Sequence, residues 1–253
     1  IINAITPCNF QIFINELSNY AADWQVMVVT DDDACSNYSG ILNQSTPNYQ
    51  SLFAAGVSNG GNGGDIGLTE RLIQMAHETI ENTDPGECNA GFLRANAMLH
   101  VIMVTDEKEH SPIPVVDMVN AIIAKKGGIP ENVKMTAIYN PSYTDGWSTY
   151  RSTRYEEAVN LTGGLLFDIT NSSTNNWASP SNLALLAEAS VISDRYDLDQ
   201  PAVESTIEVY INGYLVQGNW YYDDVQQAVI FDTNPPGEGD SIEIVYAALA
   251  ECE

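Results

Sequence analysis

Carboxylates follow two of the apolar stretches in this chain, and they are the side chains best suited to chemistry. Asp31 opens an acidic run of three residues after one stretch, while Asp106-Glu107 and the nearby Glu109 follow another. Carboxylate oxygens suit hard divalent cations, and paired carboxylates can also exchange protons with a substrate. Because the run at Asp31 lacks the alternation of an EF-hand loop, a solvated acidic turn is the better interpretation of it.

Acid–base catalysis is one interpretation of Asp106-Glu107 and Glu109-His110. No activated nucleophile accompanies them, and carboxylate-rich loops beside strand ends are common in proteins without catalysis. The glycine cluster at 60–64 lacks the Gly-Lys-Ser/Thr ending of a phosphate-binding loop. We therefore predict that the chain is not an enzyme, and a metal-dependent hydrolase at the same loops is an alternative.

Aromatic residues offer a second kind of contact. Trp147 and Tyr143 lie in a stretch rich in Ser, Thr and Gly after an apolar run that ends at Tyr139. Such a loop reaches the ligand side of an α/β sheet, so we predict an exposed aromatic contact there. Trp220 and the two tyrosines after it fit either a sugar-stacking face or a half-buried strand, and the strand is preferred.

Four cysteines, Cys8, Cys35, Cys88 and Cys252, form no CxxC pair, and the three histidines do not cluster with them, so a zinc site is not predicted. The even count favours two disulfides and an oxidising compartment: extracellular, cell surface or periplasmic. Of the three possible pairings we favour Cys8 with Cys252 and Cys35 with Cys88. Free buried thiols are the alternative.

The charge is strongly negative, with 34 acidic residues against 9 basic ones and a net charge of -25. Nucleic acids and anionic membranes attract basic surfaces, so neither is a predicted partner. No run approaches the roughly 20 apolar residues that span a bilayer, so no membrane insertion is expected. The start at Ile1 lacks the basic and apolar regions of a signal peptide, and an exported protein would already have lost its signal.

Helical and strand patterns alternate over residues 1–190. Helices are expected over 7–19, 67–82, 114–126, 155–161 and 182–190, and strands over 24–29, 99–105, 133–139 and 165–169. Residues 34–64 appear in this pattern as a loop. The order predicts an α/β domain with a Rossmann-like, mostly parallel sheet flanked by helices, in which 99–105 is a central strand. Ligands of such sheets bind beyond the carboxyl ends of the strands.

The pattern changes over residues 191–253, where strands follow one another without helices. They are expected over 206–211, 214–216, 220–222, 228–231 and 241–246, with Asn212-Gly213 as a hairpin turn. The second domain is therefore predicted to be a small antiparallel β unit.

Several short matches in fixed order resemble a known family. Gly91-Phe92-Leu93-Arg94 leads into a strand pattern that ends in Thr105-Asp106-Glu107, which looks like bacterial surface proteins with a von Willebrand factor A-like domain. The strand pattern after Asp23 and the β unit at the end fit the same family, so the resemblance covers nearly the whole chain. It implies an extracellular or cell-surface adhesion module that recognises a protein or a glycan at the loops of the sheet.

Members of that family commonly bind Mg²⁺ or Ca²⁺ through three loops. The resemblance assigns Asp106 to the aspartate of the third loop, and Thr69 or Asp65 to the second. Hydroxyl ligands with few carboxylates leave the ion able to accept a carboxylate from a partner. Asp31, Glu107, Tyr143 and Trp147 would belong to the surrounding ligand face.

The first loop of the family, Asp-x-Ser-x-Ser, has no counterpart in this chain. Since the helix expected over 7–19 resembles the one that follows that motif, the first strand is expected upstream of Ile1 or from a partner chain that completes the sheet. A neighbour that supplies this strand would favour an alternative function, in which the chain is a structural subunit of an extracellular fibre or surface assembly. The neighbour could also be a second copy of this chain, in which case the protein is a homo-oligomer.

Overall fold

The computed structural model describes residues 7–20, 24–30, 33–37, 40–58, 70–94, 97–142, 153–171, 176–191, 195–225, 227–231, 236 and 240–249. The chain divides into two compact units, Ile1–Val191 and Ile192–Glu253. Within the described residues, no helix combines the length and the apolar character that a membrane span requires.

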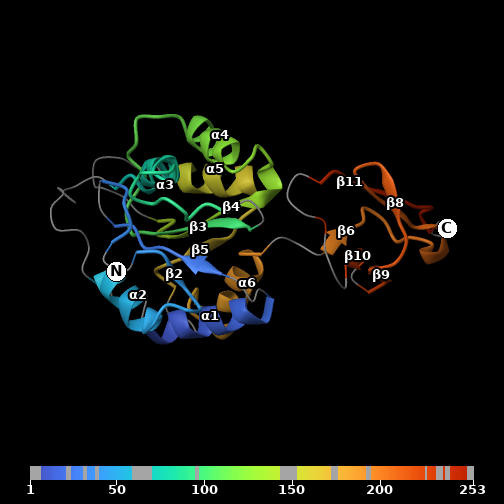
Figure 1. Ribbon diagram of the computed structural model, residues 1–253, viewed down its shortest axis with the longest axis horizontal. Helices are drawn as coiled ribbons and strands as arrows, with labels where there is room; N and C mark the ends of the chain where they lie inside the picture. The colour runs from blue at the N-terminus through green and yellow to red at the C-terminus, as the bar shows by residue number, and fades with distance from the viewer. Residues whose placement is uncertain are drawn as a thin grey trace. The chain divides into compact units, whose positions relative to one another are not determined.

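A three-stranded parallel sheet forms the centre of the first unit (Figure 1). Its strands lie in the order β3 (Leu99–Val104), β4 (Val133–Tyr139) and β5 (Leu166–Asp168). The β3–β4 register runs from Leu99 opposite Val133 to Val104 opposite Ile138. The predicted α/β class, a parallel sheet flanked by helices with separate small antiparallel sheets, is confirmed.

Helices cover both faces of this sheet, as the crossover connections between parallel strands require (Figure 1). One face carries α3 (Leu72–Glu81), α4 (Val115–Lys125) and α5 (Thr153–Thr162). The other face carries α1 (Pro7–Tyr20), α2 (Tyr49–Ser58) and α6 (Pro180–Glu188). A 3₁₀ turn, η1 (Pro130–Asn132), leads from α4 into β4.

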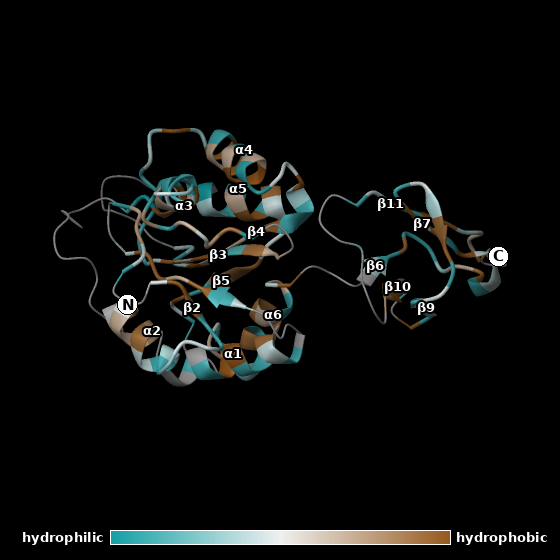
Figure 2. Cartoon of the chain, in the orientation of Figure 1, coloured by the Kyte–Doolittle hydropathy of each residue, from teal (hydrophilic) through white to brown (hydrophobic). Residues whose placement is uncertain are grey.

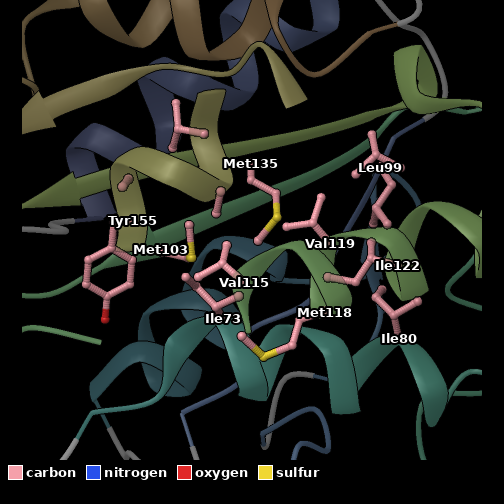
Figure 3. Close-up of a cluster of buried hydrophobic side chains, with 14 of the residues drawn as sticks. Ile73, Ile80, Leu99, Met103, Val115, Met118, Val119, Ile122, Met135 and Tyr155 are labelled. Carbon is pink, nitrogen blue, oxygen red and sulfur yellow. The ribbon is translucent and has the colours of Figure 1, made fainter. Parts of the chain in front are cut away.

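The larger core fills the space between the sheet and α3, α4 and α5 (Figure 3). Met118, Ile122 and Met135 are completely buried in it, and they come from α4 and β4. Figure 2 shows apolar residues along β3, which supplies Leu99 and Met103 to the same cluster. A smaller core lies under α1 and α6, where Trp24 meets Tyr49 edge to face at 5.3 Å.

The interpretation of residues 34–64 as a loop is wrong. They contain β2 (Leu42–Asn43), which pairs antiparallel with β1 (Gln25–Val26), and then α2. The strand expected over 24–29 is therefore shorter, and among the described residues its partner is β2 and not the parallel sheet. Burial explains the difference, because Leu42 is completely buried in the smaller core and holds the hairpin there.

The predicted start of the helix at 67 needs correction, and the structure describes one neighbour of the strand predicted to be central. Glu70 and Arg71 are not helical, since the backbone of Arg71 has a φ of -137° and the helix begins at Leu72. β3 has one described neighbour, β4, so it is an edge strand of the described sheet. The continuous apolar sequence of β3 predicts a strand with neighbours on both sides. One of these neighbours, β4, is among the described strands, and the second is not.

A disulfide joins Cys35 to Cys88, as predicted, and closes a long loop with a sequence separation of 53 residues. Asn89, which follows it, is completely buried. Its side-chain amide donates hydrogen bonds to the carbonyls of Ala34 and Thr79, and its carbonyl oxygen accepts one from the N–H of Ser36. The disulfide and this amide therefore fasten the 33–37 segment to the end of α3. The predicted pairing of Cys8 with Cys252 lies outside the residues whose side chains are described.

The connection from α5 to β5 crosses the backbone of β4 closely at Gly164. A Cβ atom on Gly164 would lie 2.0 Å from the carbonyl oxygen of Met135. The side chain of Thr162 accepts a hydrogen bond of 2.9 Å from the N–H of Met135, at a point where β5 has not yet begun. Only a residue without a side chain fits this crossing.

His100 of β3 joins the sheet to the end of α6. Its Nδ1 lies 2.7 Å from Ser190 Oγ and its Nε2 lies 2.8 Å from Thr136 Oγ1. Ser190 donates its own proton to the carbonyl of Leu186, so it accepts from Nδ1–H, and Nε2 then accepts from Thr136. This arrangement suits the neutral imidazole. Burial, with a smaller contribution from Lys134, lowers the pKa of His100 to about 3.

Acid should therefore destabilise the first unit through His100. Between pH 6.5 and 3 the unfolded chain binds a proton at this residue that the folded chain does not, so stability is complete above pH 6.5 and declines as the pH falls toward 3. One proton corresponds to about 1.4 kcal/mol of unfolding free energy per pH unit. Urea titrations of the wild type and His100→Gln over this range should converge as the pH falls. Parallel curves would contradict the prediction.

The second unit contains two three-stranded antiparallel sheets. One has the order β6 (Arg195–Asp197), β10 (Ala228–Phe231), β9 (Trp220–Asp223), and the other the order β11 (Ile242–Val245), β7 (Glu208–Ile211), β8 (Tyr214–Val216). A 3₁₀ turn, η2 (Glu204–Thr206), replaces the predicted first residue of the strand at 206. Asn212 and Gly213 both have positive φ angles and join β7 to β8 as the predicted hairpin turn.

Candidate functional site

The candidate site lies beyond the carboxyl end of β3, where the chain leaves the sheet. Thr105 is completely buried, and its N–H donates to the carbonyl of Ile138 at 3.0 Å. Its hydroxyl oxygen then accepts a hydrogen bond of 2.9 Å from the N–H of Glu107. This turn ends the strand and leaves Asp106 exposed between its two fixed neighbours.

Glu109 fixes the same loop from its other end. The side chain is 5% exposed, and its two carboxylate oxygens accept hydrogen bonds from the N–H groups of Ile73 and Ser111, at 2.9 and 3.1 Å. Because Ile73 lies in the first turn of α3, the carboxylate satisfies a free N–H group at the positive end of that helix. The N–H of His110 donates to the carbonyl of Glu70 at 2.9 Å. Glu109 therefore has a structural role, and it ties the loop to the start of α3.

The surroundings of Glu70 strongly raise the pKa of its carboxyl group. Burial, followed by the charges of Glu107, Asp106 and Glu109, raises the pKa of its carboxyl group to about 7. Its Oε2 atom is buried, and within the described part of the chain it has no hydrogen-bond partner. The charges of the neighbouring carboxylates at this edge therefore oppose ionisation of Glu70.

Tyr155 of α5 closes the inner side of the site. Its side chain is completely buried, and Figure 3 shows the hydroxyl pointing away from the apolar cluster. The hydroxyl has no hydrogen bond of ordinary length and angle among the described residues, although it lies near Glu109 and Thr105. Burial and the charges of Glu109 and Glu70 raise its pKa, so it is a neutral phenol at all physiological pH values.

The neighbouring Arg154 secures the far side of the loop. Its Nη2 atom donates to Ser111 Oγ at 3.0 Å and also to the carbonyl of Ile113. The guanidinium group therefore holds the segment between the carboxylates and α4 in place. Chemically, the site offers an exposed carboxylate on a rigid turn, further carboxylates around it and a buried phenol beneath.

The structure describes only part of the predicted site. Asp106 and Glu107 lie together, as predicted for two residues of one loop. Asp31, Asp65, Thr69, Tyr143 and Trp147 lie outside the described residues. Among the described residues, no group of three or more His, Cys, Asp or Glu side chains is arranged to hold a metal ion.

Sequence reasoning missed Glu70, Tyr155 and Arg154 as members of the site. Glu70 directly follows the predicted ligand Thr69, so its proximity was available as a signal. Tyr155 and Arg154 reach the site from a helix more than 40 residues later in the chain, and only the folded structure reveals that.

A scan against protein-family models finds no match to this chain. A search of curated proteins finds no relative.

Proposed function

We propose that the chain is an extracellular or cell-surface binding module, and not an enzyme, that recognises a protein or a glycan at the loops beyond the carboxyl end of its parallel sheet. The observation that carries this proposal is the electrostatic coupling of Glu70, Asp106, Glu107 and Glu109 at that edge. Sheets of this kind bind ligands there. The disulfide between Cys35 and Cys88 supports an oxidising compartment.

The rigidity of the edge supports recognition over catalysis. The hydrogen bonds of Thr105 and Glu109 hold the turn on both sides of Asp106, so a ligand meets a preformed surface. Tyr155, a buried hydroxyl near Glu109, is held as a neutral phenol and is not an activated nucleophile. The ligand must accept a negative surface directly or through a cation.

A divalent cation, Mg²⁺ or Ca²⁺, is the second part of the proposal. Its ligands would be Asp106 together with Asp65 and Thr69, because the described residues alone do not complete a cation site. Hard cations take carboxylate and hydroxyl oxygens, which these three residues supply. A bound cation would also relieve the repulsion that Glu70 experiences from Asp106 and Glu107.

Calorimetric titration of the full chain with Ca²⁺ and with Mg²⁺ tests this proposal. We expect a dissociation constant in the range of roughly 10⁻⁵ to 10⁻³ M for at least one ion. Asp106→Asn should weaken binding by at least about tenfold, or 1.4 kcal/mol, because it removes a charged ligand. NMR titration should show that saturating cation lowers the pKa of Glu70 from about 7.

Asp224→Asn is the matched control, since it removes the same charge from an exposed turn of the second unit. It should bind the cation as the wild type does. Equal weakening in both variants, or no binding of either ion, would contradict a site at Asp106. A glycan array probed with and without the cation then tests the glycan arm of the recognition.

A further inference from the structure

The backbone of β3 has one edge, on the side opposite β4, that no described strand pairs with. The N–H of Thr105 donates toward β4, and N–H and C=O groups point to alternating sides along a strand. The backbone N–H and C=O groups of Val101 and Met103 therefore point toward β4, while those of His100, Ile102 and Val104 point away from it. We call the backbone groups of these last three residues the outer edge of β3. No described strand pairs with them.

This edge lacks the features with which proteins protect exposed strands. Natural edge strands are short, or carry lysine, proline or a bulge, because a row of free N–H and C=O groups recruits other strands. β3 is six residues long and contains none of these features. Its sequence, Leu-His-Val-Ile-Met-Val, is that of a strand with neighbours on both sides.

Side-chain burial differs between the two faces of β3. Met103 is 3% exposed, whereas Ile102, the preceding residue and the centre of the outer edge, is 37% exposed. The two residues point to opposite faces of the sheet, and helices cover both faces (Figure 1). A strand added beside β3 would therefore lie next to the exposed apolar side chain of Ile102 and cover part of it.

We propose that the outer edge of β3 accepts an extended segment of another polypeptide chain as an additional strand of the sheet. The segment is about six residues long, to match β3, and apolar on both faces. It carries basic residues at the flank that meets Asp106 and Glu107, where the chain presents concentrated negative charge. This goes beyond the proposed recognition at the loops, and it would make the chain a subunit of an assembly.

The first measurement is amide hydrogen exchange of the full chain by NMR. The amides of His100, Ile102 and Val104 should exchange at least about tenfold faster than those of Val101, Met103 and Thr105, whose N–H groups face β4. The alternation is specific to a free edge, since fraying of the whole strand would expose all six. Equal, high protection of all six amides in the chain alone would overturn the proposal, because it would mean that the edge is already covered.

The second measurement adds a probe, the amidated peptide Val-Ile-Val-Ala-Ile-Val-Lys-Lys. It should slow exchange at the outer edge by at least about tenfold, while the same peptide with proline at its third position should not, because it lacks a donor. In the chain, Ile102→Pro removes one outward N–H and should abolish binding, while Ile102→Ala retains that N–H and should still bind.

The peptide with proline at its third position keeps this test valid even where Ile102→Pro does not fold. Peptide binding that survives both proline substitutions would overturn the proposal. So would protection of the outer edge that rises with protein concentration in the absence of peptide, because the partner would then be a second copy of this chain.

Discussion

Gly164→Ala should destabilise the first unit by about 3 kcal/mol or more, because its methyl group would lie 2.0 Å from the carbonyl oxygen of Met135 and 2.7 Å from the carbonyl carbon. These are backbone atoms of a strand that pairs on both sides, with β3 and β5. Neither β4 nor the connection after α5 can move away without the loss of hydrogen bonds, including the one between Thr162 and Met135. Urea unfolding followed by circular dichroism measures the change.

Gly163→Ala is the matched control, one residue earlier. Gly163 has a φ of +61°, which costs an alanine roughly 1–2 kcal/mol, but the nearest obstruction to its Cβ is the flexible end of Lys134 at 3.2 Å. The control should therefore be less destabilised than Gly164→Ala. The opposite order would mean that the close crossing of Gly164 over β4 is not a feature of the folded protein.

Loss of the disulfide is expected to have an effect of similar size. Replacement of both Cys35 and Cys88 by serine frees a loop with a sequence separation of 53 residues, and the entropy that the unfolded chain regains corresponds to about 4 kcal/mol. For a unit of this size, the thermal midpoint should fall by roughly 10 °C. Thermal unfolding by calorimetry measures this change.

A reductant provides the control for the double variant. It should lower the thermal midpoint of the wild type by more than that of the variant, and the two should then nearly coincide, because any disulfide between Cys8 and Cys252 is cut in both proteins. A wild type that does not respond to the reductant, while the variant is destabilised, would assign the effect to the serine side chains and not to the covalent link.

The elements with strong periodicity could be predicted from the sequence. β4 occupies 133–139 as expected, and α4 differs from the expected 114–126 by one residue at each end. Both lie in the larger core, where continuous or helically spaced apolar residues leave few alternatives. In contrast, α2 was missed because its apolar residues stand among Asn, Ser and Gly, and its stability depends on packing against Trp24 in the smaller core.

The candidate site was only partly accessible to sequence reasoning. Asp106 and Glu107 follow a clear strand, so their place at its carboxyl end was predictable. The role of Glu109 was not, because its hydrogen bond to Ile73 joins residues 36 positions apart. The position of β3 at the edge of the described sheet could not be predicted, because an apolar strand sequence shows which environment the strand requires and not which neighbour provides it.

The two hydrogen bonds of Glu109 have a consequence for protein engineering. The loop between β3 and α4 is anchored at Thr105 and again at Glu109, so the residues between these anchors can be exchanged without a change in the path of the chain on either side. Glu109 itself must be kept in any such exchange, because its carboxylate also accepts a hydrogen bond from the first turn of α3, in a different part of the chain. Residues 106–108 are therefore a short segment that can be replaced, because Thr105 and Glu109 fix the backbone on either side of it.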